Sequence, residues 1–180
     1  QSSDMKTNTV LMEGKLTWYA VYTRPRSEKK VQEALVKLHI PNYLPLLRVR
    51  KKWSDRYKWV EEPVFSSYVF VNIEYDSQSL AIMRIPHVVN FVITGSTPAV
   101  ISDTDMDLLR LTVENFAESL IIRDTSGLST GEKVRINDGP FAGKEAVIKR
   151  IQGKTLIVLS FPALNKSIEV EIPVEQIAKK

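Results

Sequence analysis

The last third of the chain, residues 129–180, holds only short β-type segments between turns, and this pattern constrains the fold most strongly. Turn residues such as Asn137-Asp138-Gly139-Pro140 and Gln152-Gly153 separate the segments. No apolar periodicity of helical length interrupts them, so about five short strands in about 50 residues predict a small five-stranded β-barrel. The expected strands are Lys133–Asn137, Ala146–Arg150, Thr155–Leu159, Ser167–Ile172 and, as a candidate fifth, Val174–Ile177.

The preceding hundred or so residues follow a different pattern, in which β-type and helical periodicities alternate. Helices are expected from Ser27 to about Ile40, over residues 77–84, and from Ser102 to Phe116. The order β-α-β-β-α-β-α is typical of a split ferredoxin-like α/β sandwich with an antiparallel sheet and one additional helix, so the expected fold class is α+β. The expected strands are Trp18–Tyr22, Tyr43–Arg50, Val64–Ile73 and Val88–Ile93.

These two patterns divide the 180 residues into two domains. Residues 1–16 are polar and lack periodicity, which predicts a mobile leader. The first domain is expected to cover residues 17–116, and the second residues 129–180. Residues 117–128 lose periodicity and are expected to form a linker.

Charge is distributed unevenly along the chain. Residues 24–58 hold eleven Lys/Arg against three Asp/Glu, whereas residues 59–128 hold three Lys/Arg against ten Asp/Glu. The basic block has two interpretations at this stage, which are a surface for a polyanion such as nucleic acid and a solvated basic face.

Several function classes are disfavoured by composition. The chain has no cysteine and only two histidines, His39 and His87, which excludes a thiol nucleophile and leaves little for a metal site. It has no P-loop, G-x-S-x-G or H-E-x-x-H motif, so neither an enzyme nor a bound cofactor or metal is expected. Without a membrane-length apolar run or a secretory signal, a cytoplasmic protein with no membrane partner is expected.

The segment Gly131–Val147, with its core V-R-I-N-D-G-P-F-A-G, resembles a KOW motif in the version found in NusG proteins. Three N-terminal segments agree with this resemblance. Residues 18–22 (W-Y-A-V-Y) resemble the opening strand of the NusG N-terminal (NGN) domain, and residues 63–71 (P-V-F-S-S-Y-V-F-V) resemble its central strand. Residues 84–92 resemble its R-x-x-x-V-x-x-F-V entry, so the likeness to the NusG family covers residues 17–178.

The resemblance implies an NGN domain followed by an SH3-like KOW barrel, acting as a monomeric transcription elongation and antitermination factor. In such proteins the N-terminal domain binds the clamp helices of bacterial RNA polymerase through an apolar pocket and suppresses pausing. The KOW domain recruits a small-subunit ribosomal protein or the termination factor Rho. Carried over to this sequence, the pocket residues are Phe65, Tyr68, Phe70 and Phe91, with Tyr19 as a weaker member. Ordinary core packing is the alternative for Phe70 and Phe91.

The resemblance also gives the basic block a role. It implies that the start of the first helix contacts the displaced non-template DNA strand, and that the hairpin lies against the upstream duplex or the polymerase. Two groups of residues are the candidates for nucleic-acid binding, one at the start of the first helix and one in a hairpin expected over Arg48–Lys58. They are Arg24, Arg26, Lys29 and Lys30, together with Lys51, Lys52 and Trp53.

In the KOW segment, the turn after the first strand is expected to bind a partner. Its candidate residues are Asn137, Asp138, Gly139 and Phe141. Phe141 follows Pro140 at the tip of a loop, which predicts a partly exposed ring. The alternative is that Phe141 folds back onto the barrel core.

Two features favour a specialised, operon-specific member similar to the RfaH and UpxY antiterminators over a general NusG. Phe65-Ser66 replaces the Phe-Pro of the general factor, and residues 23–31 are more basic. An RNA-binding or ribosome-associated KOW protein is the alternative from another class. It is disfavoured because Val64–Ile73 lacks the K/R-G-F/Y-type motif of an RNA-binding sheet.

Overall fold

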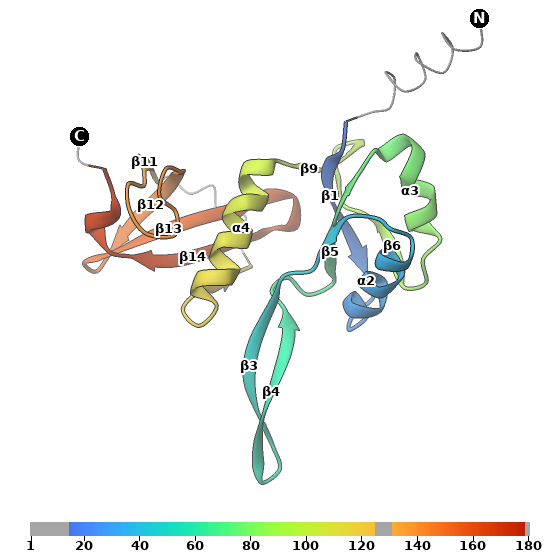
Figure 1. Ribbon diagram of the computed structural model, residues 1–180, viewed down its shortest axis with the longest axis horizontal. Helices are drawn as coiled ribbons and strands as arrows, with labels where there is room; N and C mark the ends of the chain where they lie inside the picture. Colours follow the sequence, from blue (N-terminus) through green and yellow to red (C-terminus); the bar gives the residue numbers. More distant parts are fainter. Residues whose placement is uncertain (1–14, 125–130, 179–180) are drawn as a thin grey trace, which may run out of the picture. The chain divides into compact units, whose positions relative to one another are not determined.

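The computed structural model describes residues 15–124 and 131–178 of the chain (Figure 1). The expected leader, up to residue 14, and residues 125–128 of the expected linker lie outside the described residues. The chain forms two compact units, one from Gln1–Leu44 and Ser66–Ser102, the other from Pro45–Phe65 and Asp103–Lys180. Each unit combines helices with antiparallel sheet, which confirms the α+β fold class.

The sheet of the first unit is organised around β1 (Thr17–Thr23), which pairs with three other strands. The strand order is β2-β5-β1-β6, β9 also pairs with β1, and every pairing is antiparallel. Because β1 is central, Ala20 and Val21 are both buried although they point to opposite faces. The other strands are β2 (Asn42–Tyr43), β5 (Tyr68–Ile73), β6 (Val88–Phe91) and β9 (Val100–Ile101).

Among the described residues, the helices of this unit are α2 (Glu28–Lys37) and α3 (Tyr75–Met83) (Figure 1). In α2 the expected apolar stripe is present, with Val31 and Leu35 fully buried. Helix α3 begins two residues before the expected start because Glu74 caps it, accepting hydrogen bonds from the backbone N–H groups of residues 76 and 77.

Strand β5 is shorter than the sequence predicts. The apolar run suggests a strand from Val64, but the strand begins only at Tyr68. Pro63 ends β4, and Ser67 has a φ of 71° that no extended strand allows. Phe65 therefore lies outside the sheet that contains Tyr68 and Phe70.

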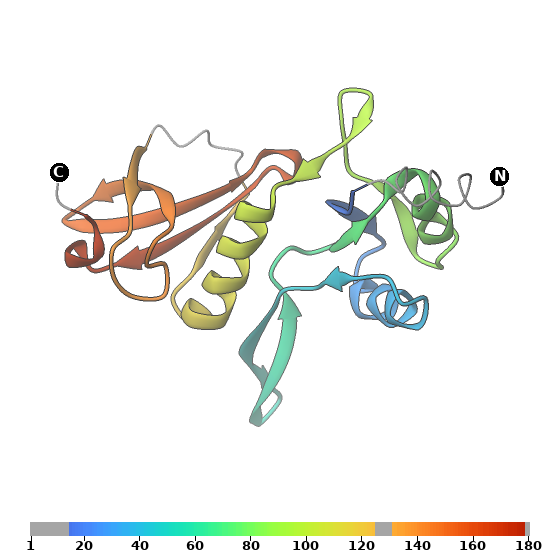
Figure 2. The same cartoon turned by 45° about the horizontal axis from the view of Figure 1, so that its top comes forward.

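The basic segment forms a β-hairpin, as expected. Strands β3 (Leu46–Trp53) and β4 (Arg56–Pro63) pair over their full length, from Leu46 opposite Pro63 to Trp53 opposite Arg56. Figure 2 shows them as one long two-stranded ribbon. The expected strand Tyr43–Arg50 is divided at Leu44-Pro45, because the Pro45 carbonyl accepts a hydrogen bond from Val64 N–H (2.8 Å) instead of joining a ladder. A second, two-residue hairpin joins β7 (Ile93–Thr94) to β8 (Thr97–Pro98).

The second unit also contains helix α4 (Asp103–Phe116) and a five-stranded antiparallel sheet of order β10-β14-β13-β12-β11. In the part of the chain that the structure describes, no pairing joins β10 to β11, so a closed barrel stays a prediction. An isolated bridge between Ile136 and Ile177 extends the β11 end. The strands are β10 (Ile121–Arg123), β11 (Glu132–Arg135), β12 (Glu145–Ile151), β13 (Lys154–Phe161) and β14 (Lys166–Ile172).

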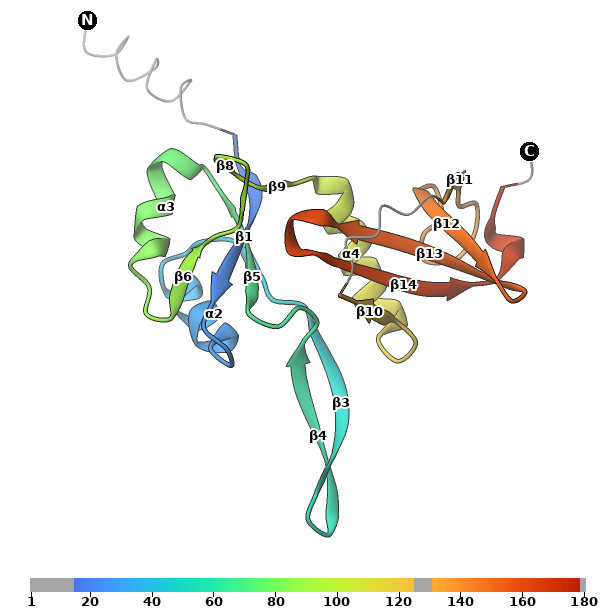
Figure 3. The same ribbon diagram turned by 180° about the vertical axis from the view of Figure 1, so that it is seen from behind.

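Two short segments of this unit differ from the expectations. Ile121–Arg123, inside the expected linker, forms β10, which runs beside β14 (Figure 3). The candidate fifth strand, Val174–Ile177, contains instead the 3₁₀ turn η2 (Val174–Gln176). A segment of three residues carries too little periodicity to reveal a strand, and β10 forms because β14 offers it a free edge.

A buried carboxylate holds β10 in place. Glu169 of β14 is 3% exposed and pairs with Arg123 Nε of β10 at 3.0 Å and with Lys149 Nζ of β12. Burial raises the pKa of Glu169, but the hydrogen bonds and positive charges of Lys149 and Arg123 outweigh burial and hold this pKa below its ordinary value of 4.5.

We predict that Glu169→Gln destabilises the protein near neutral pH and has a smaller effect in acid. Because the folded-state pKa lies below the unfolded one, the ionised carboxylate contributes stability above about 4.5, and this contribution is lost as the pH falls through the folded-state pKa. Urea unfolding midpoints of wild type and variant at about pH 7 and about pH 3 measure this convergence. An equal difference in midpoint at both values would contradict the ionised state of Glu169.

Candidate functional site

The five aromatic residues expected to form one pocket lie on three different surfaces. Neighbouring side chains of β1 alternate between the two faces of the sheet, and antiparallel partners share a face. Tyr19 lies opposite Val71, and Val21 lies opposite Phe91, which places Tyr19 and Phe91 on one face. Ala20 lies opposite Phe70, and Tyr22 opposite Tyr68, on the other face.

The first face carries a cluster of three rings. Tyr19 lies 5.4 Å from Tyr75 and 6.2 Å from Phe91, and Tyr75 lies 5.1 Å from Phe91, between ring centroids. Tyr75 opens helix α3, so this helix packs on the face that holds Phe91. Phe91 is buried at 3% exposure and contributes to the core of the unit, the alternative considered for it.

The opposite face holds the candidate binding surface of the first unit, which we call the Tyr22–Tyr68 face. The two tyrosine rings lie 5.6 Å apart at an interplanar angle of 51°, and Tyr22 is 39% exposed. Phe70 lies on the same face and is fully buried. Its members on β1 and β5 are Trp18, Ala20, Tyr22, Tyr68, Phe70 and Asn72. The sequence analysis missed Tyr22, although its two-residue spacing from Ala20 already places it opposite Tyr68 once the register is known.

Phe65 belongs to the second unit. It is 1% exposed and packs against Phe161 of β13, with ring centroids 5.3 Å apart. The expectation of one pocket formed by Phe65, Tyr68, Phe70, Phe91 and Tyr19 is therefore wrong as geometry. Tyr19 and Phe91 share one face of the sheet, and Tyr68 and Phe70 share the other.

The basic residues before and within α2 are exposed, and two of them adjoin the Tyr22–Tyr68 face. The backbone N–H of Thr23 donates to the Ser67 carbonyl (2.8 Å), and that of Arg24 donates to the His87 carbonyl (2.9 Å). These bonds fix the turn that carries Arg24 and Arg26 directly after Tyr22. Lys29 and Lys30 follow in the first turns of α2, also exposed.

The hairpin carries basic and aromatic side chains in contact with one another. On one face, Arg48 lies over the Trp59 ring (5.0 Å to the centroid) and Arg50 lies over the Tyr57 ring (4.1 Å). On the other face, Lys58 lies over Trp53 (5.7 Å). Each such cation–π contact contributes about 0.5–1 kcal/mol at an exposed site. The contacts hold the rings in place without burying them.

Of the three hairpin residues expected to bind nucleic acid, Lys51 forms an ion pair with Glu62 and Lys52 lies opposite Tyr57. Trp53 is 56% exposed at the end of β3. The sequence analysis missed four further members of the surface, although their alternate spacing, R-x-R and Y-x-W, indicates a shared face. They are Arg48, Arg50, Tyr57 and Trp59.

The loop after β11 exposes Asn137, Asp138 and Gly139 but not Phe141. Phe141 is fully buried and stacks on Phe116 of α4, with centroids 5.3 Å apart and ring planes 4° from parallel. The expected exposed ring is therefore wrong, because the last turn of α4 provides a flat apolar partner for it. Gly139 has a φ of 78°, and a Cβ there would lie 2.6 Å from the Gln176 side chain, so this turn requires glycine.

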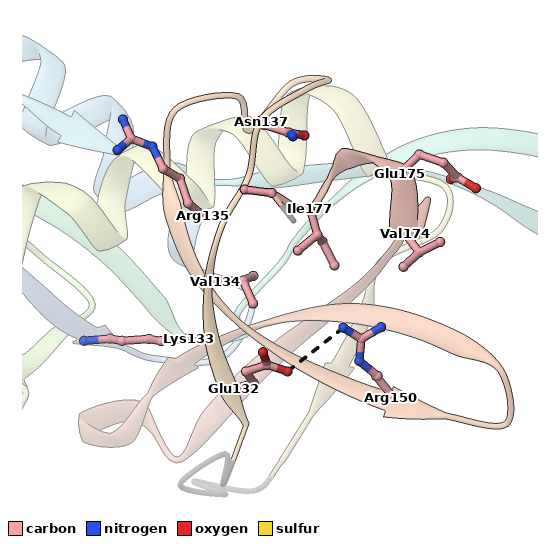
Figure 4. A pocket seen from close by; sticks show the side chains of 10 residues that line it. Glu132, Lys133, Val134, Arg135, Asn137, Arg150, Val174, Glu175 and Ile177 are labelled. Carbon is pink, nitrogen blue, oxygen red and sulfur yellow. Dashed lines mark ion pairs between the residues drawn. The ribbon is translucent and has the colours of Figure 1, made fainter. Parts of the chain in front are cut away.

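A concave pocket lies between β11 and the C-terminal segment that contains η2 (Figure 4). Val134, Val174 and Ile177 form its apolar part, and Glu132 pairs with Arg150 at its margin (4.0 Å). Its charges are of both signs, so they select neither an anionic nor a cationic ligand.

Within residues 15–124 and 131–178, no three His, Cys, Asp or Glu side chains are grouped so that they could hold a metal ion. In the same ranges, no helix is long and apolar enough to span a membrane. The surfaces described above are an aromatic sheet face, a basic hairpin and an exposed loop. They define a protein of the class that acts by binding other macromolecules.

Comparison with known proteins identifies the family. The model of the family "Transcription termination factor nusG" matches residues 16–110, more than half of the chain, and a KOW motif matches residues 130–161. The chain belongs to the NusG family of transcription termination and antitermination factors.

Curated relatives match this chain along nearly its full length. The transcription termination/antitermination protein NusG of Campylobacter jejuni is 27% identical over 173 residues, covering 90% of this chain and 96% of the relative. The protein of the same name from Escherichia coli strain K12 is 27% identical over 177 residues, covering 92% and 97%. A solved structure described as "Domain interaction in Thermotoga maritima NusG" has the same fold, with a TM-score of 0.51, 22% identity, and coverage of 91% of this chain and 96% of that one.

We predict that Phe141→Ala lowers the free energy of unfolding by about 3–5 kcal/mol, the range for removing a buried Phe ring. Phe116→Ala should couple to it by about 0.5–1.5 kcal/mol in a double-mutant cycle, because the two rings stack on each other. Chemical denaturation of the single and double variants measures both quantities.

Asn137→Ala, four residues earlier in the same loop and exposed, is the matched control and should change stability by less than about 0.5 kcal/mol. Strict additivity of Phe116→Ala and Phe141→Ala would show that the stacking contributes nothing.

Proposed function

We propose that this NusG-family protein binds bacterial RNA polymerase through the Tyr22–Tyr68 face of its first unit and acts as an operon-specific antitermination factor. The observation that carries the proposal is a pair of contacting, partly exposed tyrosines on a face that they share with Trp18 and Phe70. Exposed aromatic side chains are the usual anchors of protein interfaces, because they bury a large area at low entropic cost. Phe70 lies on the same face and is fully buried.

The specialised role is supported by residues beside that face. Ser66 stands where the general pattern has proline, and the adjoining Ser67, at positive φ, accepts a hydrogen bond from the Thr23 N–H. Arg24 and Arg26 then follow Tyr22 directly, so a polymerase-binding surface and a basic surface adjoin each other. A factor placed there could contact the polymerase and the displaced DNA strand at once, since Arg contacts to phosphate supply affinity.

The second unit is proposed to recruit a further partner through the loop after β11, a small-subunit ribosomal protein or Rho. Asn137, Asp138 and Gly139 are exposed and held by hydrogen bonds, which include Asp138 Oδ1 accepting from the Gly139 N–H at 2.9 Å. Phe141 is buried and packs inside this unit, so it does not contact the proposed partner. The NGN and SH3-like barrel descriptions of the two units are part of the same proposal.

A general NusG role is the second candidate, and it fits the comparisons equally, since the curated relatives described above are named transcription termination/antitermination protein NusG. Genome-wide polymerase occupancy, with and without the protein, distinguishes the two. A change confined to one or a few operons supports the specialised role, and a change across most transcribed genes supports the general one.

Polymerase binding is tested with Tyr22→Ala and Tyr68→Ala, singly and together, in equilibrium binding to purified bacterial core RNA polymerase. We expect each substitution to weaken binding about tenfold, in line with anchor residues at interfaces, and high salt to change the wild-type affinity little because the contact is apolar. Phe70 is left intact because it is buried in the core.

Leu80→Ala is the matched control, since Leu80 of α3 is an apolar side chain exposed to 60% in the same unit but outside the Tyr22–Tyr68 face. Wild-type affinity of the double tyrosine variant, folded by circular dichroism, would refute the proposed surface. Capture of RNA at low salt without any capture of polymerase would favour the ribosome-associated alternative.

A further inference from the structure

We infer that the β3–β4 hairpin is a binding arm for single-stranded nucleic acid, on which unpaired bases stack against Trp53, Tyr57 and Trp59. The inference deepens the proposed function and rests on it for its place in transcription, but the binding itself can be measured without polymerase.

The three aromatic rings of the hairpin are exposed to solvent. Trp53, Tyr57 and Trp59 are 56%, 58% and 53% exposed, in a segment of seven residues. Large aromatic side chains normally bury most of their area, and their exposure as a group marks a contact surface. In this hairpin the strands pair only with each other among the described residues, so no other strand covers either ladder edge.

Arginine or lysine side chains lie over each of the three rings. On one face of the ribbon, Arg48 and Arg50 lie over Trp59 and Tyr57, and the two rings stand on the same strand two residues apart. That spacing is about 6.8 Å along a β-strand. On the other face, Lys58 lies over Trp53. Each ring is therefore held beside a positive charge, the combination that binds a base and its phosphate together.

The hairpin carries a net positive charge. Residues 46–63 of the hairpin hold six Lys/Arg against three acidic residues, which are Asp55 at the turn and Glu61 and Glu62 near the end of β4. This charge selects a polyanion. Among polyanions, a single strand fits better than a duplex, because the faces of paired bases are stacked on one another and unavailable to exposed rings. An acidic protein would pair with the cations, but its carboxylates would not stack on the ordered rings.

The test uses the full-length protein and fluorescence anisotropy with labelled oligonucleotides of about 20 nucleotides, oligothymidylate DNA, oligouridylate RNA and a mixed-sequence DNA duplex. Tyr57→Ala and Trp59→Ala should each weaken single-strand binding roughly fivefold to a hundredfold at every salt concentration. The salt dependence should keep its slope, since neither change removes a charge.

Two matched variants separate stacking from charge. Tyr57→Phe and Trp59→Phe keep an aromatic ring and should restore binding to within about twofold of wild type. Arg48→Gln with Arg50→Gln should instead reduce the slope of log affinity against log salt by about 1.4, the value for two lost phosphate contacts on a single strand. Circular dichroism confirms that each variant folds.

Each result of the binding measurements either supports or overturns the inference. Binding of either single strand that depends on the rings supports the arm, and the tighter of the DNA and RNA probes identifies the strand it meets. Equal affinity for the duplex, equal binding by the alanine and phenylalanine variants, or no binding to any oligonucleotide at low salt would overturn the inference. Polymerase affinity of the hairpin variants, compared with that of Tyr22→Ala and Tyr68→Ala, keeps a failure here distinct from a failure of the proposed function.

Discussion

The pairing of β1 with three strands at once is the constraint on which the rest of the first unit depends. A strand paired on both edges cannot rotate or slip without breaking two ladders, so its alternation fixes the face of every neighbouring side chain. Tyr19 and Phe91 are thereby committed to the face that α3 covers, and Tyr22 and Tyr68 to the opposite one. The surface that we propose for binding in this unit is a consequence of register, not of the presence of aromatic residues as such.

The same alternation has a different result in the β3–β4 hairpin. There the side chains of both faces meet solvent, and the register of an isolated ribbon brings Arg50 beside Trp59 and Lys52 beside Tyr57. Cation–π contacts then replace core packing as the force that orders the rings. A segment that would be a poor strand in a core becomes a stable, charged and aromatic surface.

In the second unit, contacts with residues distant in the chain bury or pair side chains that the sequence predicts to lie in an exposed loop or a linker. Phe141 follows a proline in an exposed loop, yet Phe116 of α4 buries it by stacking. Ile121–Arg123 looks like linker, yet the buried Glu169 provides a charge partner for Arg123 and the β14 edge provides hydrogen bonds. In both cases a partner about 25 to 45 residues away in the chain decides the outcome, which is beyond the reach of local periodicity.

The sequence by itself determined the family, the α+β class, the presence of most helices and strands and the basic hairpin, because periodicity, turn residues and motif order are local properties. Only the tertiary structure decided which side chains share a surface. Phe65 and Tyr68 are three residues apart and lie in different units, since Ser67 turns the chain between them. Tyr22 and Tyr68 are 46 residues apart and touch, since antiparallel register joins them. Register and turn geometry arise from long-range hydrogen bonding and packing, which no window of sequence contains.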